Sequence, residues 1–273
     1  VEAPDRITLP AVELSLRPFQ AQLLEQLDLA RSQGHHRNLL VAATGTGKTV
    51  MAAADYARLR RRGSRGRLLF VAHRDEILEQ SRAMFALALR DASFGERWVG
   101  GERPTNFDHV FASIQSLNAT GFENLAPDHF DVVIVDEFHH AAAPSYQALL
   151  GHVQPQELLG LTATPERTDG LAVFSYFDGR IAAELRVWDA IDQHHLCPFD
   201  YFGIFDGADL QSVPWRRGRG YDPAELTHVL TDSDVWVNRV LEQVVAKIGD
   251  PLRMRALGFC VSVAHAQFVA ERF

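Results

Sequence analysis

Cysteine and lysine are both scarce in this sequence. Its 273 residues include two cysteines, Cys197 and Cys260, and two lysines, Lys48 and Lys247. Two thiols exclude a disulfide framework, although they leave room for one bridge, so we expect a reducing, cytoplasmic environment. A chain of this length buries roughly 70–75% of its unfolded surface and therefore needs no disulfide or metal ion to stabilise its core.

Long apolar runs and an excess of basic residues are also missing. No apolar run approaches the roughly 18 residues of a membrane-spanning helix, and no secretory signal pattern follows Val1. The 27 basic and 35 acidic residues give a net charge of −8 with neutral histidines. No basic domain marks a nucleic-acid binder, so any site for a polyanion must be local. The chain starts without methionine and stops at Phe273 directly after an apolar stretch, so we expect a piece of a longer protein.

Short apolar runs alternate with longer amphipathic stretches in the first two thirds of the chain. Helical patterns, notably at 49–62 and 75–90, lie between the apolar runs. Such alternation predicts an α/β fold, with a parallel sheet covered by helices on both faces. The runs typical of strands buried on both faces lie at 38–43, 67–72, 109–114, 131–136 and 158–163.

A first domain is predicted at residues 1–187, and residues 188–273 are expected to be a linker and the start of a second α/β unit. Residues 206–221 hold several glycines and arginines and predict a long exposed loop. The other expected elements of this part are helices at 189–195, 223–230, 235–248 and 264–273, a strand at 199–205 and a buried strand at 256–261.

A glycine-rich turn follows the first apolar run. Residues 42–49 read Ala-Ala-Thr-Gly-Thr-Gly-Lys-Thr. The backbone N–H groups of such a turn point at phosphate oxygens, and the following helix adds its positive dipole end. Lys48 can reach the β- and γ-phosphates of ATP, and the Thr49 hydroxyl can bind Mg²⁺. The strict pattern has glycine at position 42, and the alternative is an ordinary turn with a surface lysine. The predicted ATP-binding residues of this turn are Thr44, Gly45, Thr46, Gly47, Lys48 and Thr49.

An acidic pair follows the apolar run at 131–136. Asp136 and Glu137 are predicted to meet the glycine-rich turn at the carboxyl edge of the sheet, where α/β proteins bind ligands. There Asp136, with Thr49, would hold Mg²⁺, and Glu137 would orient or deprotonate the water that attacks the γ-phosphate. The alternative is a strand that ends in an acidic turn.

These motifs resemble those of the superfamily 2 helicases of the DEAD/DEAH class. Residues 136–139, Asp-Glu-Phe-His, are similar to motif II, which implies catalytic roles for Lys48, Asp136, Glu137 and His139. Residues 161–165, Leu-Thr-Ala-Thr-Pro, resemble motif III, in which Thr162 and Thr164 would couple hydrolysis to nucleic-acid contact.

Residues 16–20, Leu-Arg-Pro-Phe-Gln, resemble the Q motif that reads adenine in this superfamily. A glutamine amide donates and accepts hydrogen bonds together, so Gln20 suits the N6/N7 edge of adenine. Arg17 or Phe19 would stack on the base. Taken alone, Gln20 is a surface residue of a helix.

Further segments resemble motifs that contact the bound strand. Residues 71–78 are similar to motif Ia and residues 112–117 to the motif that follows it. The resemblance implies nucleic-acid contacts by His73, Arg74, Ser113 and Gln115. A helix N-terminus and a strand-to-helix turn are the alternatives. Residues 256–266 resemble motif IV, the first strand of a second RecA-like domain, which would be incomplete here.

The resemblance is greatest to bacterial helicases related to restriction-enzyme motor subunits and excision-repair helicases. It implies a superfamily 2 ATPase with a RecA-like P-loop fold, ATP and Mg²⁺ as cofactors, and DNA rather than RNA as partner. Helicase and translocase activities both stay open, and so does a regulatory or scaffold module that uses ATP as a non-catalytic switch. The family's arginine-bearing motif VI lies beyond motif IV, so we expect slow hydrolysis by these residues alone.

Overall fold

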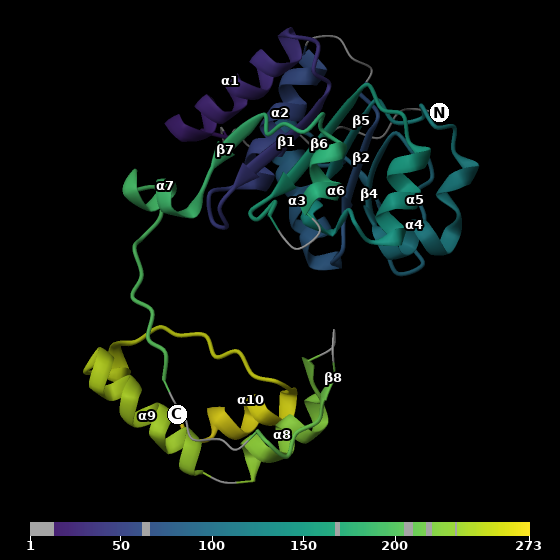
Figure 1. The fold of residues 1–273 in the computed structure, drawn as a ribbon. Coiled ribbons are helices and arrows are strands. Elements are labelled where there is room, and N and C mark those ends of the chain that lie inside the picture. The colour runs from purple at the N-terminus through teal and green to yellow at the C-terminus, as the bar shows by residue number, and fades with distance from the viewer. Residues whose placement is uncertain (1–13, 62–65, 167–169, 205–209, 217–219, 233) are drawn as a thin grey trace. The chain divides into compact units, whose positions relative to one another are not determined.

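The computed structural model describes residues 14–61, 66–166, 170–204, 210–216, 220–232 and 234–273. The chain divides into two compact units, Val1–Pro198 and Phe199–Phe273, which we name unit 1 and unit 2 (Figure 1).

A seven-stranded sheet forms the centre of unit 1, with strand order β3-β4-β2-β5-β6-β1-β7. Every pair of neighbouring strands is parallel, which confirms the predicted α/β fold class. The strands are β1 (Arg37–Ala42), β2 (Leu68–Ala72), β3 (Glu96–Trp98), β4 (His109–Ser113), β5 (Val132–Val135), β6 (Glu157–Thr162) and β7 (Ala183–Leu185).

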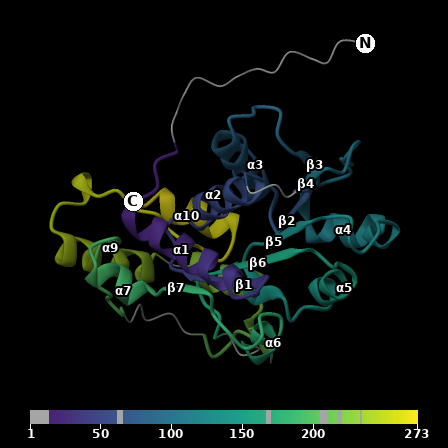
Figure 2. The same cartoon turned by 90° about the horizontal axis from the view of Figure 1, so that it is seen from above.

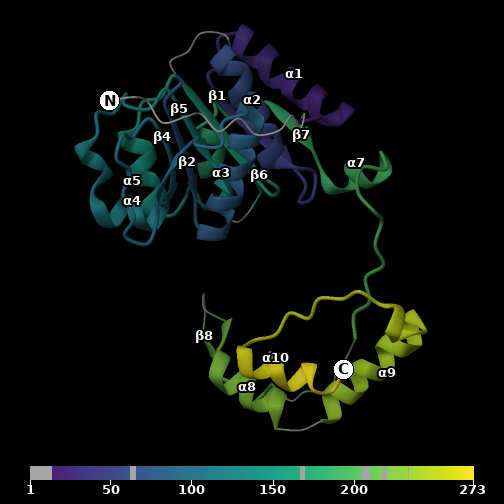
Figure 3. The same ribbon diagram turned by 180° about the vertical axis from the view of Figure 1, so that it is seen from behind.

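Helices cover both faces of this sheet, as Figures 2 and 3 show from above and from behind. The helices of unit 1 are α1 (Pro18–Ser32), α2 (Lys48–Arg61), α3 (Asp75–Leu89), α4 (Ile114–Thr120), α5 (Pro144–His152), α6 (Gly170–Ser175) and α7 (Val187–Asp192), with single 3-10 turns η1 (Phe122–Asn124) and η2 (Phe138–His140).

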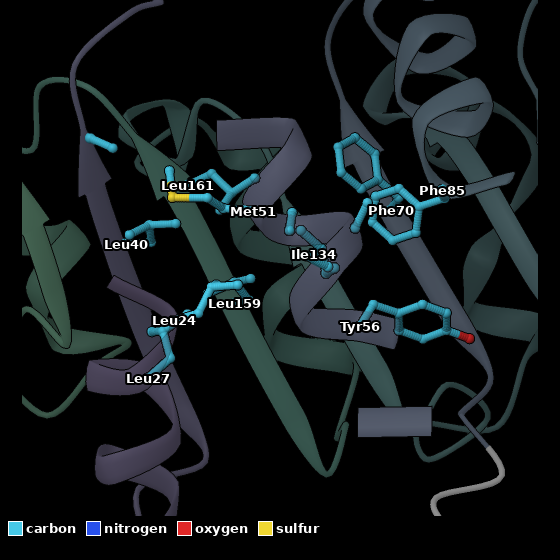
Figure 4. Close-up of a cluster of buried hydrophobic side chains, with 14 of the residues drawn as sticks. Leu24, Leu27, Leu40, Met51, Tyr56, Phe70, Phe85, Ile134, Leu159 and Leu161 are labelled. Atoms are coloured by element: carbon cyan, nitrogen blue, oxygen red, sulfur yellow. The ribbon is translucent and has the colours of Figure 1, made fainter. Parts of the chain in front are cut away.

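Two hydrophobic clusters fill the spaces between the sheet and its helices. One contains side chains of α1, α2 and α3 packed on one sheet face, and Figure 4 shows ten of its residues by name. The other contains side chains of α4 and α5 on the opposite face. Alternate residues of the central strands point to opposite clusters: Phe70 lies in the first, and its neighbours Leu69 and Val71 lie in the second. Both faces are therefore buried, which is why these strands are almost continuously apolar.

Unit 2 contains three helices among its described residues, α8 (Pro223–Thr231), α9 (Val235–Ile248) and α10 (Val263–Ala270), and the 3-10 turn η3 (Pro251–Arg253). Asp222 caps α8 by accepting hydrogen bonds from the N–H groups of Ala224 and Glu225. A two-stranded antiparallel ribbon, β8 (Trp215–Arg216) with β9 (Gly220–Tyr221), lies within the range 206–221, where we expected only a loop.

The prediction of two strands in unit 2 is wrong for the residues that the structure describes. Residues 199–204 and 256–261 form no strand, and residue 205 lies outside the described ranges. The side chains of Leu257 and Phe259 are 86% and 94% exposed, although we expected them to be buried. A strand needs a hydrogen-bonded partner, and the described part of unit 2 supplies none to either segment.

Helix α7 belongs to unit 1, although the sequence placed a domain boundary at residues 187 and 188. The turn after α7 is held by the N–H groups of His195 and Leu196, which both donate to the carbonyl of Ala190. In this turn the ring of His195 stacks on Phe19 of α1, with centroids 4.3 Å apart. Unit 1 therefore extends past the expected boundary to Pro198.

None of the helices among the described residues is long and apolar enough to cross a membrane.

Candidate functional site

The parallel sheet brings the predicted site residues to one edge. Each central strand ends at its carboxyl end in a segment that the sequence analysis selected. Read across the sheet, Ser113 ends β4, His73 follows β2, Asp136 follows β5, Thr162 ends β6, and the glycine-rich turn follows β1. Residues far apart in the sequence thus share one edge, as predicted for a ligand site in an α/β protein.

The glycine-rich turn has a backbone that requires its glycines. Gly45 and Gly47 have φ angles of 88° and 86°, a region that favours glycine. Thr46 is buried and holds the turn through its hydroxyl, which donates to the carbonyl of Ala43 at 2.6 Å. Ala42, where the strict pattern has glycine, is the last residue of β1, so its strand conformation requires no glycine.

Lys48 begins α2 and lies across the turn. Its Nζ donates to the carbonyl of Ala42 at 3.2 Å, so the ammonium group lies over the turn. Thr49 follows in the first turn of the helix. The first N–H groups of a helix lack intrahelical partners and favour anions. The turn, the cation and the helix start therefore form a cradle that suits phosphate groups.

Gln20 of helix α1 is hydrogen-bonded to the glycine-rich turn. Its Nε2 donates to the carbonyl of Thr46 at 2.8 Å, and its Oε1 accepts from the N–H of Arg17 at 2.9 Å. A Cβ atom on Gly47 would lie 2.6 Å from Gln20 Nε2, so a side chain at this position would displace the Gln20 amide. The amide keeps one N–H and one oxygen lone pair for a further partner. Gln20 thus connects the segment predicted to read adenine with the phosphate loop.

Phe19 is buried and Arg17 is exposed, so these two candidates for base stacking differ in access. The stacked ring of His195 covers Phe19. Leu196 Cδ2 lies 3.4 Å from the position that a Cβ atom of Gly45 would take. We did not select His195 or Leu196 from the sequence, because only the folded path of the chain after α7 brings them to the phosphate loop.

Asp136 and Glu137 lie at the end of β5. The N–H of Asp136 donates to the carbonyl of Val71 at 2.9 Å, and its carboxylate accepts from the N–H of Glu137 at 2.9 Å. Burial raises the pKa of Asp136, while the hydrogen bond from Glu137 and the positive charge of Lys48 oppose that rise. The Lys48 charge thus favours the ionised form of the Asp136 carboxyl.

His139 joins the acidic pair to β6. Its Nδ1 lies 3.2 Å from Glu137 Oε2 and 3.2 Å from Thr162 Oγ1. Thr162 is fully buried, and its hydroxyl accepts the N–H of Thr164 at 3.2 Å. The segments that resemble motifs II and III are thus in direct contact.

Tyr146 of α5 is a residue that the sequence analysis missed. It is 3% exposed, and its hydroxyl has no hydrogen-bond partner among the residues that the structure describes. Burial and the negative charges of Asp136 and Glu137 raise the pKa of Tyr146 to about 12. A polar atom is thus buried close to the acidic pair, and no motif in the sequence marks it.

The four predicted nucleic-acid contacts lie on the β2 and β4 side of the same edge. Arg74 is exposed at the N-cap of α3. Ser113 is buried, and its hydroxyl caps α4 by accepting the N–H of Ser116 at 3.1 Å. Gln115 Nε2 donates to the carbonyl of His73 at 3.3 Å. The fold therefore brings all four together, with Arg74 and Gln115 exposed.

No group of three or more His, Cys, Asp or Glu side chains in the described ranges is arranged to hold a metal ion. A Mg²⁺ ion at this edge would therefore take most of its oxygen ligands from nucleotide phosphates and water, as it does in phosphoryl-transfer sites. Thr49 and Asp136 offer the hydroxyl and carboxylate oxygens that such an ion prefers, so the residues present fit the predicted metal.

A parallel sheet with a glycine-rich turn after β1 and an acidic pair after β5 is the arrangement of a RecA-like, helicase-type motor domain of superfamily 2. Residues 13–167 match the model of the family described as "Type III restriction enzyme, res subunit", and the chain belongs to this family.

Individual relatives agree with this assignment. The chain is 26% identical over 280 residues to the Type I restriction enzyme EcoAI endonuclease subunit of Escherichia coli, covering 93% of this chain and 33% of that protein. It is 33% identical over 166 residues to irc3 of Schizosaccharomyces pombe, named as a mitochondrial ATP-dependent helicase, covering 58% of this chain and 27% of irc3. The chain thus spans about a third of the length of the curated relatives that it matches.

Among solved structures, a nuclease-deletion mutant of the Type ISP restriction-modification enzyme LlaGI, in complex with a DNA substrate mimic, has a similar fold. The TM-score is 0.51 at 16% identity, and the match covers 86% of this chain and 23% of that one.

Proposed function

We propose that this chain carries the ATP-hydrolysing domain of a motor that moves along or unwinds DNA. The observation that carries the proposal is the meeting, at one sheet edge, of the phosphate loop, the acidic pair and Thr162. Only β6 lies between β5, which the acidic pair follows, and β1, which the loop follows, so the loop and the acidic pair can serve one ligand.

The loop residues Thr44 to Thr49 would bind the phosphates of ATP. The N–H groups of the turn would donate to phosphate oxygens, and the Lys48 ammonium would turn from the Ala42 carbonyl toward the β- and γ-phosphates. Thr49 and Asp136 would hold Mg²⁺, which when bound neutralises charge on the phosphate oxygens. Gln20 and Arg17 would bind the adenine from the α1 side, with Phe19 as the buried support beneath them.

Glu137 would act as general base in hydrolysis. Its carboxylate would accept the proton of the attacking water, and a positioned base contributes about 10²–10⁴ in rate. His139 would orient this carboxylate through their 3.2 Å contact. Through Thr162, His139 also links the base to Thr164, so these two threonines would couple hydrolysis to nucleic-acid contact.

The nucleic-acid strand would lie along the β2 and β4 side of the edge, over His73, Arg74, Ser113 and Gln115. DNA is proposed over RNA because LlaGI, the restriction-modification enzyme of similar fold, is bound to a DNA substrate mimic. Unit 2 would begin the second RecA-like domain of the motor, with the division between the two domains near Pro198.

Stimulation of ATP hydrolysis by nucleic acids tests this function in the intact protein. We expect single-stranded, duplex or forked DNA to raise the turnover rate more than RNA of matched length. Lys48→Ala should weaken triphosphate binding and abolish both basal and stimulated turnover. Equal stimulation by RNA would contradict the DNA assignment, and unchanged ATP affinity in Lys48→Ala would contradict the site itself.

A further inference from the structure

The strand order separates the candidate nucleotide site from the candidate nucleic-acid surface at one junction. The phosphate loop, Thr162 and the acidic pair follow β1, β6 and β5, whereas His73 and Ser113 belong to β2 and β4. Strands β5 and β2 are direct neighbours in the sheet. Any signal between the two surfaces on the shortest path must therefore cross from the segment after β5 to the segment after β2.

A pair of histidine rings spans this junction. His140, at the end of η2, meets His73 edge to face, with ring centroids 5.3 Å apart and an interplanar angle of 62°. His73 Nδ1 is buried without a hydrogen-bond partner among the described residues, so the ring is positioned by packing rather than by a bond at that atom. The backbone carbonyl of His73 accepts from Gln115 Nε2 at 3.3 Å. His140 therefore contacts His73 after β2 directly and is connected through His73 to Gln115 after β4.

The other end of this path is the candidate general base. Glu137 is the N-cap of η2 and has φ and ψ angles of 50° each, a left-handed conformation that is uncommon outside glycine. The N–H of His140 donates to the carbonyl of Glu137 at 3.0 Å, which closes the four-residue turn from Glu137 to His140. Glu137 and His140 thus stand at the two ends of one tight turn, so a rotation of the Glu137 backbone would be transmitted to His140.

We propose that His140 is a positioning residue that couples the hydrolytic Glu137 to the nucleic-acid surface through its ring contact with His73. This inference rests on the proposed function. The path through His139 and Thr162 leads from the same turn toward β6, and the two paths touch, because the rings of His139 and His140 lie 4.2 Å apart. Nucleic acid that displaces His73 would shift His140 and, through η2, set the Glu137 carboxylate; ATP binding would act in reverse, since coupling between two sites is reciprocal.

The test is the ratio of DNA-stimulated to basal ATP turnover in His140→Ala and His140→Phe variants of the intact protein. We expect His140→Ala to keep basal turnover within about twofold and to lose roughly tenfold or more of the stimulation, on the order of 1.4 kcal/mol of coupling. DNA affinity without nucleotide should change by less than about threefold. His140→Phe, which keeps an edge-to-face ring contact, should retain most of the stimulation.

His152→Ala is a matched control, because the His152 ring makes a similar edge-to-face contact, with Phe122 at 5.5 Å and 70°. It should leave the stimulation ratio unchanged. Full stimulation in His140→Ala, or basal turnover that falls in step with stimulated turnover, would overturn the coupling role alone. Wild-type protein without Lys48-dependent hydrolysis would overturn the proposed function and this inference with it.

Discussion

Gly47 occupies the tightest position in the phosphate loop. Its φ angle of 86° strains any L side chain, and a Cβ atom there would lie 2.6 Å from Gln20 Nε2. Gln20 is the end of a flexible side chain, so it would swing away rather than break the fold. A side chain at position 47 would therefore break the hydrogen bond from Gln20 to the Thr46 carbonyl, and nucleotide binding would weaken as a result.

Gly47→Ala should weaken ATP binding in addition to destabilising unit 1, whereas the control variant should only lose stability. We expect the dissociation constant for ATP to rise by about tenfold or more, which corresponds to 1.4 kcal/mol. Gly34→Ala is the matched control, because Gly34 has a φ angle of 85° and open space around its Cβ position. Both variants should lose about 1–2 kcal/mol of stability from the left-handed backbone. ATP binding by Gly47→Ala at the wild-type level in calorimetry would refute the role of the Gln20 hydrogen bond.

At the scale of elements, a buried network of ion pairs joins α1, α2 and β6. The Arg31 guanidinium donates to both carboxylate oxygens of Asp55 at 2.7 Å, and its Nε donates to Glu157 Oε2 at 3.0 Å. Asp55 is 1% exposed, so its charge depends on this partner. The network holds the helix that carries Gln20 against the helix that carries Lys48.

Arg31→Met should destabilise unit 1 by about 3–5 kcal/mol, because it leaves the Asp55 carboxylate buried without a counter-charge. Arg82→Met serves as control: Arg82 pairs with the half-exposed Glu79 at 2.8 Å, and such a surface pair contributes about 0–1 kcal/mol. Denaturant unfolding followed by circular dichroism measures both values. Equal, small losses in the two variants would show that the network does not hold these elements together.

At the scale of the whole molecule, the central strands of unit 1 could be predicted from the sequence, whereas its two edge strands could not. The five central strands are buried on both faces, so each one leaves an apolar run in the sequence. Strands β3 and β7 were missed because they are three residues long, mix charged with apolar side chains and lie at the sheet edges. In unit 2, the apolar run 256–261 predicted a strand, but its sequence cannot show whether a partner strand is present.

The candidate site also has parts that a local sequence pattern marks and parts that it does not. The phosphate loop and the acidic pair could be predicted because each is a local segment whose chemistry requires particular residues in a fixed order. His195, which stacks on Phe19, is brought there by tertiary packing, and no local pattern marks it.

The central claim is that this sheet edge hydrolyses ATP rather than only binding it, and Glu137→Gln tests it most directly. The measurement is ATP affinity together with the turnover rate in the intact protein, with Glu102→Gln as control because the Glu102 side chain is 60% exposed. We predict that Glu137→Gln keeps ATP affinity within about threefold and loses about 10²–10⁴ in turnover, the contribution of a general base. Glu102→Gln should match the wild type. Turnover unchanged by Glu137→Gln, or no turnover in the wild-type protein, would contradict the account and favour a nucleotide-binding switch.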